Sequence, residues 1–311
     1  MTSTLELGPV LRVKSAEVRV GTCSWTDKTL LKEADWYPKR TMSAAERLAF
    51  YSARFPVVEA DSTYYRPPST ELTGGWAERT PDGFRMNVKA YSLMTGHPTR
   101  PDSLWPDIAE ALAPESADKR NVYPHHLPDD AVDEVWERFA AALAPLREAG
   151  KLGAVLLQYP PWFTPKRDNR DELARARRRL GDLPICVELR SPLWFGRDDL
   201  DRTLRWLSDH DLALVDVDAP KVAKLPRLDA VTADLAVVRF HGRADDTWKT
   251  TTGTAAERFK YLYDKRELRP WVKRVEKLAS EADEVHVLMN NCYQDYGVRN
   301  AADMTDLLGV L

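Results

Sequence analysis

Carboxylates, basic side chains and a histidine recur at the ends of short apolar segments of this sequence, and such groups can transfer protons once they are brought together. The residues that we predict to be catalytic are Glu59, Lys89, Glu188, Asp216 and His241. Glu188 is the first choice for the base, because Arg190 lies two residues on and can keep the carboxylate ionised. The alternative is that these charges only pair with one another and hold the structure together.

Aromatic, amide and further charged residues occur at the same segment ends, and they predict a pocket for a polar ring. Aromatic faces stack on sugars or nucleobases, while arginines bind carboxylate or phosphate groups. The same aromatic residues could instead pack loops together. The predicted ligand is therefore a small polar, ring-containing molecule that can carry a negative charge, bound by Trp25, Asp61, Tyr64, Tyr65, Gln158, Trp162, Arg190, Trp194, Arg239, Asn290 and Asn291.

Eight short apolar segments must position these residues, at 18–25, 57–63, 84–89, 154–158, 185–190, 212–218, 235–241 and 285–291. Most of them start roughly 25 to 40 residues apart, which fits one strand and one helix each and favours a parallel sheet. Eight such units predict an α/β fold of the TIM (β/α)8 barrel type in a single domain. A doubly wound open sheet is the alternative, but no G-x-G-x-x-G follows the first segment.

Longer gaps after the third and seventh segments predict insertions over roughly 91–128 and 242–265. Helical patterns are expected at 47–55, after a capping box from Ser43 to Glu46, and at 130–149, 198–210 and 270–282. No clear helical pattern covers 220–234. Alternation along the strands predicts which polar groups share the inner face of the barrel, namely Glu59 with Asp61, Arg85 with Lys89, Glu188 with Arg190, Asp216 with Asp218, and Arg239 with His241.

Composition and charge limit the classes of partner. Among 311 residues, 45 are Lys or Arg and 48 are Asp or Glu, so the net charge of −3 attracts neither nucleic acid nor an anionic membrane. No apolar run approaches the roughly 20 residues of a membrane span. Residues 1–16 lack the features of a secretory signal and are expected to form a loose tail before a domain at 17–311. Three widely spaced cysteines, without a CxxC pair, favour the cytoplasm.

Other functions remain open at this point. Glu59, Glu188, Asp216 and His241 could hold a divalent metal, as in metal-dependent isomerases or endonuclease-like phosphoester hydrolases, although no other cofactor is implied. A retaining glycosidase is disfavoured, because it would need carboxylates at the ends of the fourth and seventh segments, where this chain has Gln158 and His241. A non-catalytic barrel that binds a ligand or nucleic acid is the third possibility. The arginines at 175 and 177–179 favour a solvated helix face over a nucleic-acid site.

Several motifs together resemble the domain of unknown function 72 family, the YecE-like proteins. They are Gly21-Thr-Cys-Ser-Trp25, Glu59-Ala-Asp-Ser-Thr-Tyr-Tyr65, Phe84-Arg-Met-Asn-Val-Lys89, Leu156-Leu-Gln-Tyr-Pro-Pro-Trp-Phe163, Val187-Glu-Leu-Arg190, Arg239-Phe-His-Gly242, and Asn290-Asn291 followed by Asn300-Ala301. The resemblance implies a TIM barrel and supplies no reaction. This chain departs from the family pattern at Cys23-Ser24, at Asp61, where the family has Asn, and at Thr95-Gly96-His97, where the family has Thr-His.

Overall fold

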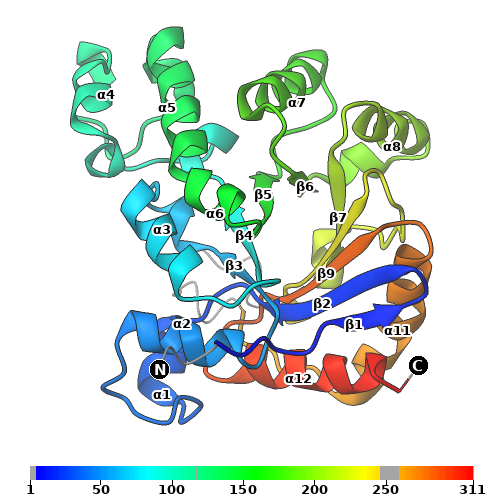
Figure 1. The fold of residues 1–311 in the computed structure, drawn as a ribbon. Helices are drawn as coiled ribbons and strands as arrows, with labels where there is room; N and C mark the ends of the chain where they lie inside the picture. Colours follow the sequence, from blue (N-terminus) through cyan, green and yellow to red (C-terminus); the bar gives the residue numbers. More distant parts are fainter. Residues whose placement is uncertain (1–4, 117, 246–258, 311) are drawn as a thin grey trace.

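A closed parallel barrel forms the centre of the molecule in a computed structural model that describes residues 5–116, 118–245 and 259–310 (Figure 1). Each strand from β2 to β9 pairs in parallel with the next in sequence order, and β9 pairs in parallel with β2. This closure confirms the predicted TIM barrel. The barrel strands are β2 Ala16–Thr22, β3 Val57–Ala60, β4 Arg85–Lys89, β5 Leu152–Tyr159, β6 Ile185–Leu189, β7 Ala213–Asp218, β8 Leu235–Phe240 and β9 Glu284–Met289.

The N-terminal segment is more ordered than expected. β1, Leu11–Val13, pairs antiparallel with β2, and Lys14 supplies the positive φ of 52° at the turn between them. Val13 and Ala16 are buried, so this hairpin adds apolar contacts as well as backbone hydrogen bonds. The expectation of a loose tail over 1–16 is therefore wrong for the residues from Leu11 onward.

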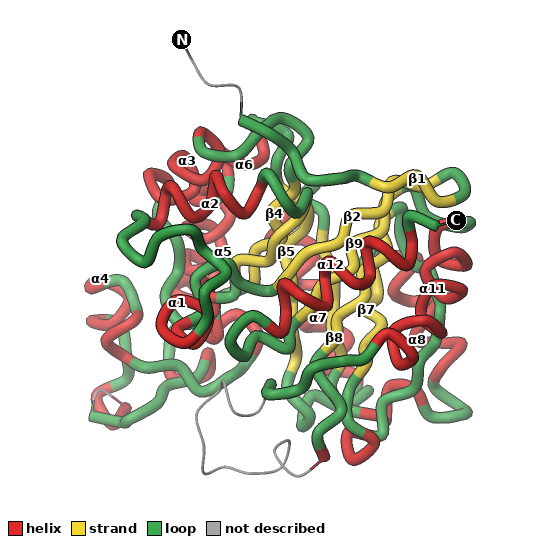
Figure 2. The backbone as a smooth tube through the Cα atoms, turned by 90° about the horizontal axis from the view of Figure 1, so that it is seen from below, coloured by secondary structure: helices red, strands yellow, loops and turns green. Residues whose placement is uncertain are grey.

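Helices surround the strands, which lie in the middle of the molecule when it is seen from below (Figure 2). The expected helices appear as α2 (Ala44–Ser52), α5 (Asp129–Ala142) with α6 (Ala144–Glu148), α8 (Leu200–Asp209) and α11 (Lys265–Ala279). The expected helix at 130–149 is interrupted at Leu143, where Pro145 cannot supply a backbone N–H. The last of them begins at Lys265 rather than Pro270, because Asp264 caps it and forms a capping box with Glu267.

The bounds of the helices, in chain order, are α1 Lys28–Glu33, α2 Ala44–Ser52, α3 Thr70–Glu78, α4 Pro106–Glu110, α5 Asp129–Ala142, α6 Ala144–Glu148, α7 Arg167–Leu180, α8 Leu200–Asp209, α11 Lys265–Ala279 and α12 Tyr296–Leu308. Ser43 and Glu46 make the expected capping box before α2. Within the described ranges, no helix is both long and apolar enough to cross a membrane.

The connections after β4 and β8 are the long ones. The insertion expected over 91–128 contains α4, several short 3-10 turns and a bridge between Thr99 and Val122. Most of the second expected insertion, residues 246–258, lies outside the described residues. The stretch 220–234 contains a 3-10 turn at Lys221–Ala223 and no α-helix, as the sequence indicates.

Apolar side chains fill the barrel below its carboxyl end, and they fix which residues point inward. The interior cluster comprises Cys23, Val57, Ala154, Leu156, Cys186, Ala213, Val215, Val217, Val237 and Leu288. Because Val215 and Val217 point inward on β7, Asp216 and Asp218 point outward. The predicted inner face is therefore wrong for this strand. By the same alternation Leu288 places Asn290 inward and Asn291 outward.

Candidate functional site

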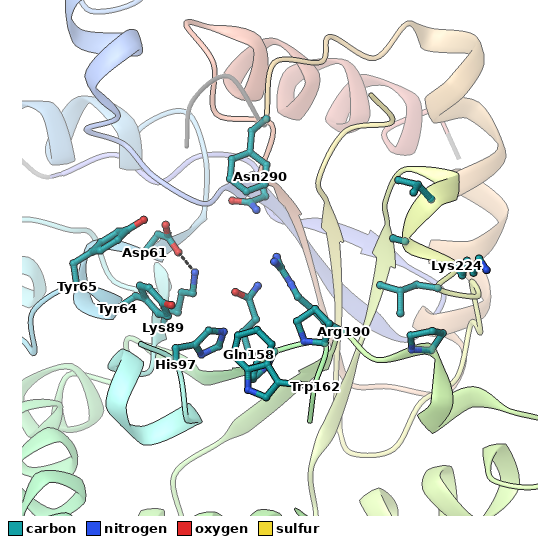
Figure 3. Close-up of a pocket in the computed structure, with 17 residues that line it drawn as sticks. Asp61, Tyr64, Tyr65, Lys89, His97, Gln158, Trp162, Arg190, Lys224 and Asn290 are labelled. Carbon is teal, nitrogen blue, oxygen red and sulfur yellow. Dashed lines mark hydrogen bonds and ion pairs between the residues drawn. The ribbon is translucent and has the colours of Figure 1, made fainter. Parts of the chain in front are cut away.

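A cavity of about 690 Å³ opens at the carboxyl ends of the barrel strands, where the active sites of such barrels lie (Figure 3). Its wall includes eight of the predicted site residues: Asp61, Tyr64, Tyr65, Lys89, Gln158, Trp162, Arg190 and Asn290. Among its described lining residues, Lys89, Arg190 and Lys224 are cationic and Asp61 is the one carboxylate. The cavity surface therefore favours a negatively charged ligand.

One wall of the cavity combines an ion pair with aromatic rings. Lys89 Nζ donates to Asp61 Oδ1 at 2.6 Å and lies 4.5 Å from the centre of the Tyr64 ring. Tyr64 in turn packs edge-on against Tyr65 at 5.1 Å. This part of the cavity therefore offers a cation and an aromatic face within reach of one bound molecule (Figure 3).

His97 is a cavity residue that the sequence analysis did not assign to the site. Its ring lies 5.3 Å from the ring of Tyr64 and 6.1 Å from that of Trp162, and its Nδ1 lies 2.9 Å from Thr95 Oγ1. Burial lowers the pKa of His97 to about 4, with help from the nearby cations Lys89 and Arg190. The imidazole is therefore neutral at pH 7 and can accept a proton.

Beneath the cavity, Glu188 is the centre of a buried hydrogen-bond network. Its Oε1 accepts from Gln158 Nε2 at 2.8 Å and from Arg190 Nε at 2.9 Å, while Oε2 accepts from Arg239. Burial alone would raise the pKa of Glu188, but Arg239, His241 and Arg190 outweigh it and hold the pKa well below its usual range. With its side chain 1% exposed, this carboxylate holds Arg190 and Gln158 in place instead of facing the cavity.

Arg239 connects Glu188 to Glu59. Its Nη2 donates to Glu59 Oε1 at 2.7 Å and lies 3.7 Å from the sulfur of Cys23. Burial raises the pKa of Glu59, although Arg239 opposes this effect. The other oxygen of Glu59 has no hydrogen-bond partner among the described residues. These groups fill the interior of the barrel below the cavity.

His241 is held in one tautomer between two neighbours. Its Nδ1 lies 2.7 Å from the amide nitrogen of Asn290, which can only donate, so Nδ1 accepts. Nε2 therefore carries the proton and donates to Glu188 Oε1 at 3.2 Å. Burial lowers the pKa of His241 to about 4, so the ring is neutral at pH 7. Asn290 belongs both to this network and to the cavity wall.

Four predicted site residues lie away from the cavity. Asp216 accepts the backbone N–H groups of Leu228 and Asp229 on the outer side of β7. The other three pack loops or helix ends: Trp25 meets Trp76 edge-on at 5.7 Å, Trp194 donates to the carbonyl of Phe163, and Asn291 donates to Tyr261 and Asn300. The side chains of these four residues therefore pack or form hydrogen bonds within the fold, as in the alternative to a binding role.

Loops supply the cavity residues that the sequence analysis missed. Besides His97 they are Pro160, Pro161, Pro192, Val222, Ala223, Lys224, Leu225 and Phe259. They lie outside the strands, so strand alternation gives no signal for them. The sequence contains one indication for His97, namely that Thr95-Gly96-His97 stands where the family pattern has Thr-His.

The proposed metal ligands do not form a metal site, because their polar atoms bind other groups of the protein and His241 donates to Glu188. Glu59 and Glu188 both bind Arg239, and Asp216 points away from them. Over the described ranges, no cluster of three or more His, Cys, Asp or Glu residues is arranged to hold a metal ion.

On α7, the arginines predicted to form a solvated face pair with carboxylates, as Arg175 does with Glu172 at 2.8 Å and Arg179 with Asp133 at 2.6 Å.

The fold and the cavity together define a TIM-barrel protein with a polar, cation-lined pocket at the carboxyl end of its strands. The chain belongs to the family described as "Protein of unknown function DUF72", whose model matches residues 19–311. It is 29% identical to the UPF0759 protein YunF of Bacillus subtilis (strain 168) over 299 residues, which cover 94% of this chain and 95% of that protein.

Solved structures of the same family show the same barrel. A DUF72 family protein from Enterococcus faecalis V583 is 27% identical, with a TM-score of 0.73 over 94% of this chain and 95% of that chain. Another, from Thermotoga maritima MSB8, is 26% identical, with a TM-score of 0.73 over 94% and 98% of the two chains. These similarities support the architecture and assign no reaction.

Proposed function

We propose that this protein is an enzyme that uses acid–base catalysis on a small polar, ring-containing, anionic molecule bound at the barrel mouth. The observation that carries the proposal is the cavity wall itself, where Lys89 and Arg190 stand beside the rings of Tyr64, Tyr65 and Trp162. A guanidinium and an ammonium bind an anionic group, and the rings provide a stacking face. Glu188 fixes the Nε–H of Arg190, which orients its guanidinium before a ligand arrives.

We infer that proton transfer is carried out by groups on the cavity wall. His97 lies in the cavity wall and is neutral at pH 7, so its ring can take a proton from the ligand once the bound anion offsets Lys89 and Arg190, the cations that lower its pKa. Lys89 faces the same space and can stabilise the negative charge that results. Asp61, paired with Lys89, keeps the ammonium in position. Glu59, Glu188 and His241 act in this proposal as positioning residues, because they lie beneath the cavity and hold the groups that face it.

Hydrogen exchange on the ligand tests this proposal before the full reaction is known. The protein is incubated in D₂O with a panel of sugar acids, sugar phosphates and pyrimidine carboxylates, and ¹H NMR follows the loss of C–H signals. A compound of one class is expected to bind and to lose a specific C–H signal. In His97→Gln the exchange is expected to stop while the affinity stays within about threefold, since the anion contacts remain.

His210→Gln is the matched control, because His210 stacks on Trp206 on α8 and does not line the cavity. It is expected to exchange the ligand as fast as the unmodified protein. A ligand that binds at the mouth and stays unchanged and unexchanged after long incubation would instead identify a non-catalytic binding protein and refute the enzyme proposal.

A further inference from the structure

A second cavity, of about 830 Å³, lies beside the barrel mouth between α5 and α7. We call it the α5–α7 cleft; Val132 and Trp136 line it from α5. Pro160 and Trp162 line both this cleft and the mouth cavity, so the turn after β5 forms the ridge between them. Trp162 is 61% exposed on that ridge. A molecule bound at the mouth can therefore pass over this ring into the cleft.

A buried hydroxyl group in the cleft has no partner. Tyr159 is the last residue of β5, and its ring is buried and stacked on Phe163 at 4.0 Å. Its hydroxyl makes no hydrogen bond to any residue that the structure describes. The charges that act on it belong to Glu172, Arg179 and Arg175, which also line the cleft. Because a buried polar group without a partner is unfavourable, this hydroxyl is suited to a polar group of a ligand.

The charges in the cleft differ from those at the mouth. Its lining carboxylates are Asp129, Asp133, Asp168 and Glu172. Arg175 and Arg179, which also line it, are already paired with Glu172 and Asp133. Asp129 and Asp168, in the first turns of α5 and α7, take no part in these two pairs. The cleft therefore disfavours a second anionic group and can accept hydrogen bonds from hydroxyls.

We propose that the ligand spans both cavities and is a sugar acid linked to a neutral sugar. This inference rests on the proposed function and specifies its substrate class. The acidic unit lies at the mouth on Lys89 and Arg190, the chain crosses Trp162, and hydroxyls of the neutral unit bond Tyr159 and the carboxylates of the cleft. The amides of Gln158 and Asn290 at the mouth suit ring hydroxyls. A nucleotide would instead favour a glycine-rich phosphate loop, which neither the β8 nor the β9 connection has.

Calorimetric titration tests whether one ligand occupies both cavities. The three probes are glucuronic acid, cellobiose, and cellobiouronic acid, in which glucuronic acid is linked to glucose. Cellobiouronic acid is expected to bind at least about tenfold more tightly than glucuronic acid, because only the disaccharide reaches the cleft. Cellobiose is expected to bind most weakly, since it lacks the carboxylate.

Substitutions in the cleft distinguish the affinity that it contributes from the affinity that the mouth contributes. Val132→Trp fills the cleft from the partly exposed face of α5. It is expected to abolish the gain in affinity of cellobiouronic acid over glucuronic acid and to leave the affinity for glucuronic acid unchanged. Val132→Ala, the matched control, leaves the cleft open and keeps the gain. Tyr159→Phe removes only the unpartnered hydroxyl and is expected to fold normally and to reduce the gain.

The outcomes distinguish this inference from the proposed function. If the disaccharide binds no more tightly than glucuronic acid, or if Val132→Trp keeps the full gain, the cleft is not part of the site and the proposed function stands. If neither sugar acid binds but another anion of the NMR panel does, the sugar-acid class is refuted and the mouth site remains. If no anion binds, both proposals fail together.

Discussion

Replacing Glu188 with Gln tests whether the buried charge network holds the barrel mouth in place. The change keeps the size of the side chain but removes the charge that faces Arg239 and Arg190. Arg239 then keeps Glu59 as its remaining carboxylate partner. Removing one member of a buried ion pair costs about 3–5 kcal/mol. For a chain of this size each kcal/mol lowers Tm by about 2 °C, so Tm is expected to fall by about 6–10 °C.

Thermal unfolding at pH 7 measures this effect, and Asp61→Asn is the matched control. The Asp61 side chain is 30% exposed at the cavity, so water can take its place beside Lys89, and its pairing with Lys89 is worth less than about 1 kcal/mol. The control is therefore expected to lose about 2 °C or less. A Glu188→Gln protein that melts within 2 °C of the unmodified protein would show that the network is not what stabilises the mouth.

The pH dependence of the same variant gives an independent check. The folded pKa of Glu188 lies below its unfolded value of about 4.3, so the carboxylate contributes its full stabilisation above that pH. As the pH falls below about 4, the native carboxylate loses this advantage. The difference in free energy of unfolding between the unmodified protein and Glu188→Gln should therefore be constant from pH 8 to 5 and shrink below about 4. A difference that grows on acidification would contradict the assigned direction of the pKa shift.

Three further substitutions test particular contacts. In Asp216→Asn the amide nitrogen cannot accept a backbone N–H of the loop, so the variant should be less stable than the unmodified protein at pH 4. Because burial raises the pKa of Asp216 to about 6, this deficit in unfolding free energy should shrink by about 1–2 kcal/mol between pH 4 and pH 7.5; a deficit that grows with pH would contradict the direction of the shift. Gly21→Ala should lower Tm by more than about 5 °C, because a Cβ would lie 1.9 Å from the carbonyl oxygen of Val57, whereas Gly74→Ala in α3 should leave Tm unchanged or raise it. Trp194→Phe should lower the unfolding free energy by about 1–3 kcal/mol, because the hydrogen bond to the carbonyl of Phe163 is lost, and should leave ligand affinity unchanged. Weaker ligand binding would show that Trp194 belongs to the binding site.

Much of the barrel could be predicted because parallel strands bring their carboxyl ends to one edge. Spacing of the apolar segments was enough for the strand order, and alternation placed Glu59, Glu188, Arg239 and His241 together. These four form one hydrogen-bonded network in the structure. The sequence identifies such groups because one set of alternate residues on each of their strands becomes charged toward the carboxyl end while the other set stays apolar, so the charged set is assigned to the barrel mouth.

That reasoning fails on β7, and the reason is physical. Both faces of this strand begin apolar, with Leu212 and Leu214 on one side and Ala213, Val215 and Val217 on the other. Alternation then cannot say which face is inner, because a strand covered on both sides needs apolar residues on both. The smaller side chains fill the narrow interior, and Asp216 and Asp218 instead hold the loop after the strand through its backbone and through Arg227.

Depth within the barrel is the other property that the sequence did not reveal, and it decides the chemistry. Glu188 and Arg190 share a face and are two residues apart, yet the first is enclosed by donors and the second reaches the cavity. The same holds for His241 beneath Asn290. Because a group must touch the ligand to transfer its proton, the level at which a side chain ends separates a catalytic role from a positioning role. On that criterion His97, which comes from a loop, is better placed to be the base than Glu188, the carboxylate that alternation singled out.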